Sequence, residues 1–371
     1  MLYLRNKYLE AHYLVYKIIS IFYYKNVKVR VISDLHYYLN LAYSPTEFTD
    51  ILSKIKPADV TLIAGDMACD TEEALTFLQK YFPNERVIFV AGNHDLCVYK
   101  SENSTTVQEV IANYRATFNS TTFDGKWIYL ENDYCHLGGN IFVIGCAGWT
   151  NFEYGHKTRS QYIQEINREK ARREREKFID TDKIFGPEFG SGKQRVIYCG
   201  EIPDDPGAYY DELQMGSKES YRGRRMKEAV RCMNDYRYGK IQRDDGSVDI
   251  LRPSDTYNMH QESLAYIRKA YKEIVEKCPD ATIILMTHHP FTTKCVGRRY
   301  KDDPLTSAFV SDHNRWLKQF GNIKYIVSGH VHSRFITMLG DKQVITNPCG
   351  YCYYYEHIQD VKFDPNYIVE I

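Results

Sequence analysis

Five short apolar runs that stop abruptly at polar residues constrain the fold of this chain more than any other feature. They span residues 27–33, 59–64, 86–91, 282–286 and 324–328, and each is rich in Val or Ile with little alternation. Such runs indicate strands buried on both faces of a sheet. Segments with helical character lie between them, at 71–81 and at 260–277, where Ser254 and Asp255 are capping candidates. Buried strands alternating with helices predict a layered α/β architecture.

Polar residues follow each of these runs. The motifs are Asp34-x-His36, Gly65-Asp66, Gly92-Asn93-His94-Asp95, His288-His289 and Gly329-His330-x-His332. Because ligands in layered α/β folds collect at the carboxyl ends of the strands, we expect these side chains to converge there. Carboxylate, amide and imidazole groups are the ligands of a pair of divalent ions that activates water and clamps a phosphate. Asp66 is the candidate bridging ligand, since Gly65 lets the backbone turn closely there.

The five motifs in this order resemble those of the calcineurin-like metallophosphoesterase superfamily. The resemblance covers roughly residues 27–155 and 230–355. It extends to segments outside the metal motifs, which resemble a microbial and phage-type branch: Trp149-Thr-Asn-Phe152, Met233-Asn-Asp-Tyr236, Pro304-Leu305 with Ala308-Phe309, and Asn347-Pro-Cys-Gly-Tyr351. This chain departs from that branch by the insertion of most of residues 155–231.

The resemblance implies an α/β fold of the metallo-dependent phosphatase type, a four-layer αββα sandwich. It implies one metal held by Asp34, His36, Asp66 and His332, and a second held by Asp66, Asn93, His288 and His330. His94 is implied as the general acid, with Asp95 orienting it. An imidazole with a pKa near 6.5 suits that role, and a carboxylate neighbour favours its protonated form. Ligation by nitrogen and oxygen favours Mn, Fe or Zn, with Mg or Ni also compatible.

Two segments lie outside this pattern. Residues 1–26 are expected to form an N-terminal helical extension to a 27–371 metallophosphoesterase domain. Their longest apolar run, 18–24, is shorter than the ~20 residues that span a bilayer, so a buried or partner-packed helix is expected, with peripheral membrane contact as the alternative. The charged insertion at about 155–231 contains a helix with ion pairs such as Glu169 with Arg173. It is a surface insertion, or else a lid or a docking surface for a partner or a second copy.

The net charge and the cysteines bear on nucleic-acid binding and on the cellular compartment. Lys+Arg and Asp+Glu both total 48, so no net field recruits nucleic acid, and only the insertion carries a basic cluster. Ten scattered cysteines without a secretory signal favour reduced thiols and a cytoplasmic location. We interpret Cys349 and Cys352 as ordinary thiols in a tyrosine-rich loop, because no thioredoxin-like context supports a redox motif.

The predicted activity is hydrolysis of a phosphate ester, in the first place a phosphodiester of a nucleotide or another small molecule. A phosphomonoesterase, a protein phosphatase or a nuclease on the same site are the alternatives, and a non-enzymatic scaffold is disfavoured because every ligand position is filled. Protein phosphatases of the superfamily usually carry an arginine pair, which residues 67–70 and 96–99 lack. Arg298 and Tyr300, in the loop after His288, are expected to contact the substrate, since guanidinium groups grip phosphate bidentately.

Overall fold

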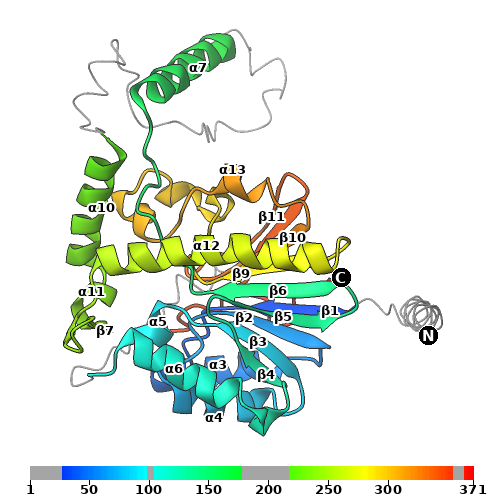
Figure 1. The fold of residues 1–371 in the computed structure, drawn as a ribbon. Helices are drawn as coiled ribbons and strands as arrows, with labels where there is room; N and C mark the ends of the chain where they lie inside the picture. The colour runs from blue at the N-terminus through cyan, green and yellow to red at the C-terminus, as the bar shows by residue number, and fades with distance from the viewer. Residues whose placement is uncertain (1–26, 98–103, 178–216, 354–362) are drawn as a thin grey trace, which may run out of the picture. The chain divides into compact units, whose positions relative to one another are not determined.

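The computed structural model describes residues 27–97, 104–177, 217–353 and 363–371 (Figure 1). The chain divides into two compact units, one formed by residues 1–154 and 226–371 and the other by Gly155–Arg225. The second unit lies inside the predicted insertion and contains α7 (Arg159–Lys177) and most of α10 (Lys218–Cys232). The expected N-terminal helix at 1–26 lies outside the described residues. Among the helices that the structure describes, none combines the length and apolar character needed to cross a membrane.

The first unit contains two sheets of mainly parallel strands. The five-stranded sheet has the order β13 (Ile368–Glu370), β1 (Lys28–Ile32), β2 (Val60–Ala64), β3 (Arg86–Val90), β4 (Trp127–Tyr129). The six-stranded sheet has the order β11 (Phe335–Leu339), β12 (Lys342–Thr346), β10 (Ile323–Ser328), β9 (Thr282–Thr287), β6 (Ile141–Cys146), β5 (Asp133–Gly138). Only the edge strands β13, β11 and β5 pair in antiparallel fashion.

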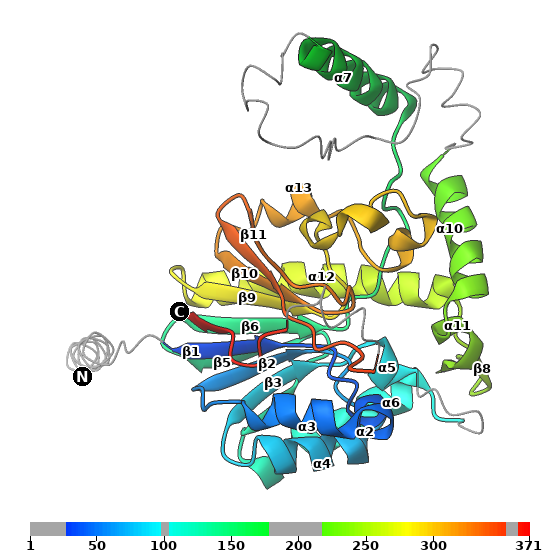
Figure 2. The same ribbon diagram turned by 180° about the vertical axis from the view of Figure 1, so that it is seen from behind.

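Helices cover the outer face of each sheet, as Figure 2 shows. Against the first sheet lie α2 (Tyr37–Tyr43), α3 (Pro45–Ser53), α4 (Thr71–Tyr81) and α6 (Val107–Phe118), with the short α5 (Asn93–Leu96) at its edge. Along the second sheet run α12 (Pro253–Lys277) and α13 (Asn314–Leu317), together with short 3-10 helices after β9. The short helix α11 (Asp235–Tyr238) leads into a small hairpin of β7 (Lys240–Gln242) and β8 (Val248–Ile250).

Three hydrophobic cores hold these layers together. One lies between the sheets and joins residues such as Val31 and Leu62 to Val143 and Ile284. The other two lie between each sheet and its helices. Because successive side chains of a strand point to opposite faces, Val31 enters the central core while its neighbour Ile32 enters an outer one. The predicted four-layer αββα sandwich is therefore confirmed.

The five predicted strands correspond to β1, β2, β3, β9 and β10, and the helix predicted at 71–81 is α4. The second predicted helix begins earlier than expected, at Pro253. Asp255 caps it from the third helical position, where its carboxylate accepts a hydrogen bond from the Arg252 amide at 2.8 Å. The buried strand β6 was not predicted, because its apolar run ends at Ala147 and Gly148 rather than at a polar motif.

Candidate dinuclear metal centre

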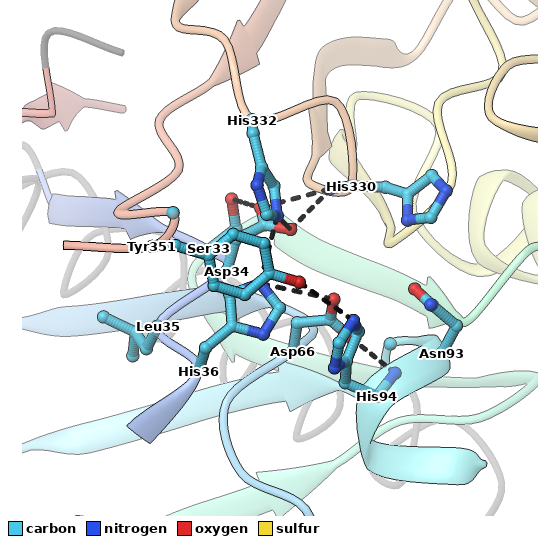
Figure 3. Close-up of polar contacts among 12 residues, drawn as sticks. Ser33, Asp34, Leu35, His36, Asp66, Asn93, His94, His330, His332 and Tyr351 are labelled. Atoms are coloured by element: carbon cyan, nitrogen blue, oxygen red, sulfur yellow. Dashed lines mark hydrogen bonds and ion pairs between the residues drawn. The ribbon is translucent and has the colours of Figure 1, made fainter. Parts of the chain in front are cut away.

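The predicted ligands come together at the carboxyl edge of both sheets. Asp34 and His36 follow β1, Asp66 follows β2, Asn93 opens α5 after β3, His288 follows β9, and His330 and His332 follow β10. All of them are buried except His332, which is partly exposed. Figure 3 shows Asp34, His36, Asp66 and His332 turned toward one another. The packing of two parallel sheets, with their strand ends at one edge, is what gathers residues from both halves of the sequence.

The ligand atoms form two groups that share Asp66. In each group the atoms lie within 4.8 Å of one another; the first contains Asp34, His36, Asp66 and His332, and the second contains Asp66, His288 and His330. In the first group, His332 Nε2 lies 3.3 Å from Asp34 Oδ1, and His36 Nε2 lies 3.7 Å from Asp66 Oδ2. In the second, His288 Nε2 lies 3.4 Å from Asp66 Oδ2 and 3.0 Å from Asn93 Oδ1.

This donor set fits a pair of divalent cations. The Nε2 atom of His330 is buried and has no hydrogen-bond partner. A buried polar atom of this kind carries a desolvation cost that a cation would offset. The Nε2 atoms of His36 and His332 lie 3.0 Å apart. Two facing imidazole nitrogens can share either one proton or one cation. Both groups thus contain the nitrogen and oxygen donors that divalent metals take.

Backbone contacts orient several of the ligands. His288 Nδ1 lies 2.9 Å from the Ala64 carbonyl, so this nitrogen donates and Nε2 is left to face Asp66. The Asp34 carboxylate accepts hydrogen bonds from the His330 amide at 2.9 Å and the Ser33 hydroxyl at 2.5 Å. The loops after β1 and β10 are thereby tied together through a predicted ligand.

Strained backbone conformations accompany these ligands. Five of them have positive φ: Asp34 (52°), His36 (40°), Asp66 (53°), His330 (68°) and His332 (40°). Each such residue costs of order 1–3 kcal/mol, and residues of this kind cluster at functional sites. Gly65, with φ of 84°, is required as well, because a Cβ there would lie 2.4 Å from His288 Nδ1. Besides allowing the turn that the sequence predicted, Gly65 thus permits the close approach of the loops after β2 and β9.

His94 stands beside the ligands and contacts two tyrosines. Its Nδ1 lies 3.2 Å from the Tyr38 hydroxyl and its Nε2 lies 3.2 Å from the Tyr351 hydroxyl. The His94 amide donates to Asp66 Oδ1 at 2.9 Å, which ties α5 to the shared carboxylate. The Tyr351 ring also stacks on His36, with centroids 4.4 Å apart. Tyr38 was not singled out from the sequence, since no motif marks a tyrosine at the second position of α2.

The Asp95 carboxylate lies beneath the loops after β2 and β3. It accepts hydrogen bonds from the backbone amides of Gly92 (2.7 Å), Asp66 (2.7 Å) and Ala68 (2.9 Å). Burial, together with the negative charge of Asp66, raises the pKa of Asp95 to about 7. These contacts favour a role for Asp95 in fixing the two loops, in addition to the role that the family resemblance implies.

Burial and the nearby carboxylates change the pKa values of the histidines at the centre. Burial alone lowers the pKa of His288, but the nearby Asp66 and Asp34 carboxylates outweigh it and raise that pKa to about 9. Burial lowers the pKa of the proposed ligands His36 and His330, which favours neutral rings, and it lowers the pKa of His94 as well, which makes the protonated His94 ring a stronger acid. Neutral imidazole is the form that binds a metal.

A pocket of about 420 Å³ opens onto the centre. Asp66, Asn93, His94, His330 and His332 line its inner end. Its outer walls come from the loops after β9, β10 and α10 and include the apolar residues Met233, Val296, Leu305, Phe309, Val310 and Val331. Of the two predicted substrate contacts, Tyr300 lines this pocket, whereas Arg298 is exposed and does not. His289 packs beside the proposed ligand His330, with ring centroids 4.1 Å apart.

Comparisons with known proteins bear on the family and the fold of this chain. Residues 27–195 match the family model described as calcineurin-like phosphoesterase. The chain is similar in structure to the phosphopantetheinyl hydrolase of Mycobacterium tuberculosis, at 14% identity and a TM-score of 0.51, over 93% of this chain and 96% of that one. A putative 5'-nucleotidase from Staphylococcus aureus also matches, at 12% identity and a TM-score of 0.36, over 88% of this chain and 49% of the other. No curated protein matches the sequence.

The likeness to solved structures at such low identity concerns the fold alone. The family match covers the loops that carry Asp34, His36, Asp66 and Asn93. Residues 27–195 therefore carry the features of the calcineurin-like phosphoesterase family, and on that match together with the αββα fold the chain is a hydrolase of phosphate esters.

Proposed function

We propose that this protein is a phosphodiesterase of small molecules, such as nucleotides, that works with two divalent metal ions. One observation carries the proposal: two groups of ligand atoms share Asp66, lie beside His94, and open onto a single pocket. In this proposal one ion is held by Asp34, His36, Asp66 and His332, and the other by Asp66, Asn93, His288 and His330. Mn, Fe or Zn suit this mixture of nitrogen and oxygen ligands best.

The two ions, when bound, lower the pKa of a water and neutralise charge on the phosphate oxygens. The protein itself supplies the proton for the leaving group. His94 lines the pocket with the ligands, so its ring is within reach of an ester held there. The hydroxyls of Tyr38 and Tyr351 contact both of its nitrogens, and each hydroxyl can accept from a protonated ring or donate to a neutral one. We assign His94 as the general acid and the two tyrosines as its positioning residues.

The pocket favours a diester over a monoester. Among the described residues that line it there is no Lys or Arg, while Asp235 and Asp303 are both present. A monoester dianion would meet no cationic side chain there beyond the metal centre, whereas a diester carries a single negative charge. A diester also carries a second organic group, which the apolar walls around Leu305 and Phe309 can receive. A phosphomonoesterase or a nuclease on the same site is the second candidate.

A comparison of two chromogenic substrates tests the proposal. The metal-loaded protein is assayed on bis-p-nitrophenyl phosphate and p-nitrophenyl phosphate, with Mn²⁺ and after chelation. We expect chelator-sensitive cleavage that favours the diester and falls by about 10²–10⁴ in kcat for His94→Ala. His136→Ala is the matched control, because His136 is exposed on β5 and does not line the pocket. Preference for the monoester would support the second candidate, and equal rates for His94→Ala and wild type would remove His94 from the mechanism.

A cytoplasmic location is proposed on the cysteine usage. All nine cysteines in the described part of the chain are free thiols, and six of them are buried. Free thiols of this number suit a reducing compartment. Detection of the tagged protein in a membrane or secreted fraction of its native cell would contradict this proposal.

A further inference from the structure

Two cysteines lie next to each other directly behind the proposed metal centre. The Sγ atoms of Cys349 and Cys352 are 3.9 Å apart, and the two residues are only 8% and 5% exposed. They are separated by Gly350 and Tyr351, in the loop that follows β12. The sequence offered no reason to treat them as more than ordinary thiols. Their juxtaposition in the fold changes that interpretation.

The distance between the sulfurs is close to what a disulfide needs. A disulfide bond measures about 2.05 Å and joins residues whose Cβ atoms are about 3.5–4.5 Å apart. Two sulfurs at 3.9 Å therefore have to approach by roughly 2 Å. Rotation of the two side chains supplies part of this movement, and a small adjustment of the four-residue turn supplies the rest.

The turn that carries the cysteines is bound to the metal-ligand loop. The amides of Cys349 and Gly350 donate to the carbonyls of Ser33 and Asp34, each at 2.9 Å. Asn40 holds the same turn from the other side, accepting from the Cys352 amide at 2.8 Å and donating to the Gly350 carbonyl at 2.9 Å. Closing a disulfide across this turn would disturb these hydrogen bonds, because both of its ends are anchored.

Tyr351, between the two cysteines, reaches into the centre itself. Its ring stacks on His36, its hydroxyl lies 3.2 Å from His94 Nε2, and its centroid lies 4.9 Å from that of His332. Figure 3 shows this ring beside His36 and below His332. A change in the backbone of the turn therefore displaces a side chain that touches two proposed ligands and the proposed general acid.

We propose that Cys349 and Cys352 form a reversible disulfide on exposure to a peroxide, and that this disulfide slows hydrolysis by displacing Tyr351. One thiolate attacks a peroxide oxygen, the O–O bond breaks, and a sulfenic acid and hydroxide form. The second thiol then gives up its proton and attacks the sulfenic sulfur, which forms the S–S bond and releases water. In sum, two thiols lose two electrons and two protons, and hydrogen peroxide becomes two waters.

The covalent half of the proposal is tested without any measurement of activity. The full-length, Mn²⁺-loaded protein is treated with hydrogen peroxide, its remaining thiols are alkylated, and the digest is analysed by mass spectrometry. We expect a peptide in which Cys349 and Cys352 have together lost two hydrogens and escape alkylation, and which dithiothreitol converts back. Alkylation of both residues after treatment, or oxidation to sulfinic acid instead, would overturn the proposal.

The functional half rests on the proposed phosphodiesterase activity. We expect peroxide to lower kcat several-fold on bis-p-nitrophenyl phosphate, with little change in KM and with recovery in dithiothreitol. Cys349→Ser and Cys352→Ser should keep the activity of the reduced wild type and resist peroxide. Cys278→Ser, at the far end of α12, should remain as sensitive as wild type. Equal inactivation of all variants would assign the loss to oxidation elsewhere and refute the coupling.

Metal binding distinguishes failure of this inference from failure of the proposed function. If the reduced protein cleaves no test ester, calorimetric titration of Mn²⁺ into the reduced and disulfide forms still reports on the coupling. Tyr351 stacks on His36, so the disulfide form should bind Mn²⁺ several-fold more weakly. A disulfide that forms fully and changes neither Mn²⁺ affinity nor kcat would show that the cysteine pair is not linked to the centre.

Discussion

The substitution Gly92→Ala tests how closely the loops after β2 and β3 approach each other. A Cβ on Gly92 would lie 2.0 Å from Asp66 Oδ1 and 2.6 Å from the Asp66 amide nitrogen, whereas ordinary contacts begin at 3.4 Å. The shared carboxylate would have to retreat by about 1.4 Å, and the backbone that carries it by about 0.8 Å. The backbone at Gly92 is extended, with φ of −99° and ψ of −175°, so alanine fits the conformation itself. The perturbation is therefore steric and is directed at Asp66.

The expected effect is large on activity and modest on stability. A misplacement of about 1 Å at a catalytic centre costs on the order of 10²-fold in rate, so kcat on the diester should fall by at least that factor. Overpacking costs about 1–3 kcal/mol in the free energy of unfolding, part of which is offset because alanine has less freedom than glycine in the unfolded chain. Mn²⁺ content after gel filtration should fall below two ions per chain.

The control for this experiment is Gly321→Ala. A Cβ at Gly321 meets nothing within 4 Å and its φ is not positive, so both activity and Mn²⁺ content should match wild type. Wild-type kcat together with two bound ions in Gly92→Ala would refute the reasoning, because Asp66 could not then be the carboxylate shared by both groups in the position described.

Three further outcomes are expected. Replacing Tyr351 or Tyr38 with Phe removes one hydrogen bond to His94, and we expect kcat to fall roughly tenfold. The fall should be larger for esters with poor leaving groups than for esters of p-nitrophenol. An equal fall for all leaving groups would contradict a role of the tyrosines in orienting the acid. Chelation should lower the midpoint of thermal unfolding of the wild type by a few degrees in differential scanning fluorimetry, since ligands that bind only the native state stabilise it. The midpoint of Asp66→Asn should be nearly unchanged by chelation. Burial raises the pKa of Glu131 from 4.5 to about 7. The stability tied to its neutral form is therefore present below pH 4.5 and lost as pH rises through 7. At pH 8 the free energy of unfolding of Glu131→Gln should exceed that of wild type by on the order of 3 kcal/mol, and urea titrations should show that it changes less with pH.

Much of the architecture could be predicted from local patterns. Runs such as the one that becomes β2 are apolar along their whole length, and this happens only where a strand is covered on both faces. The four layers and the grouping of the seven proposed metal ligands followed from the resemblance of these motifs to the calcineurin-like metallophosphoesterase superfamily. The location of α4 also follows from local chemistry, since Asp70 caps it by accepting from the Glu73 amide.

What local patterns could not show is which side chains hold the proposed catalytic residues. Asp95 stands next to His94 in the sequence, yet its carboxylate accepts from the amides of Gly92, Asp66 and Ala68. Hydroxyls from Tyr38 and Tyr351, more than 300 residues apart in the chain, contact the His94 ring. Arg298 and Tyr300 were both predicted to contact the substrate; Tyr300 lines the pocket, whereas Arg298 is exposed and is not among the residues that line it.

The sequence by itself determined which residues are proposed as metal ligands and the edge of the fold at which they gather, because the apolar runs and the polar residues that end them are local patterns. The tertiary structure decided how close these side chains come to one another, which loops adopt strained backbone conformations, and which residues surround the site. The position of the turn with Cys349 and Cys352 against the loop after β1, and the apolar walls of the pocket, arise from contacts between segments distant in the chain. Such contacts depend on the packing of one sheet against the other, which no window of sequence contains.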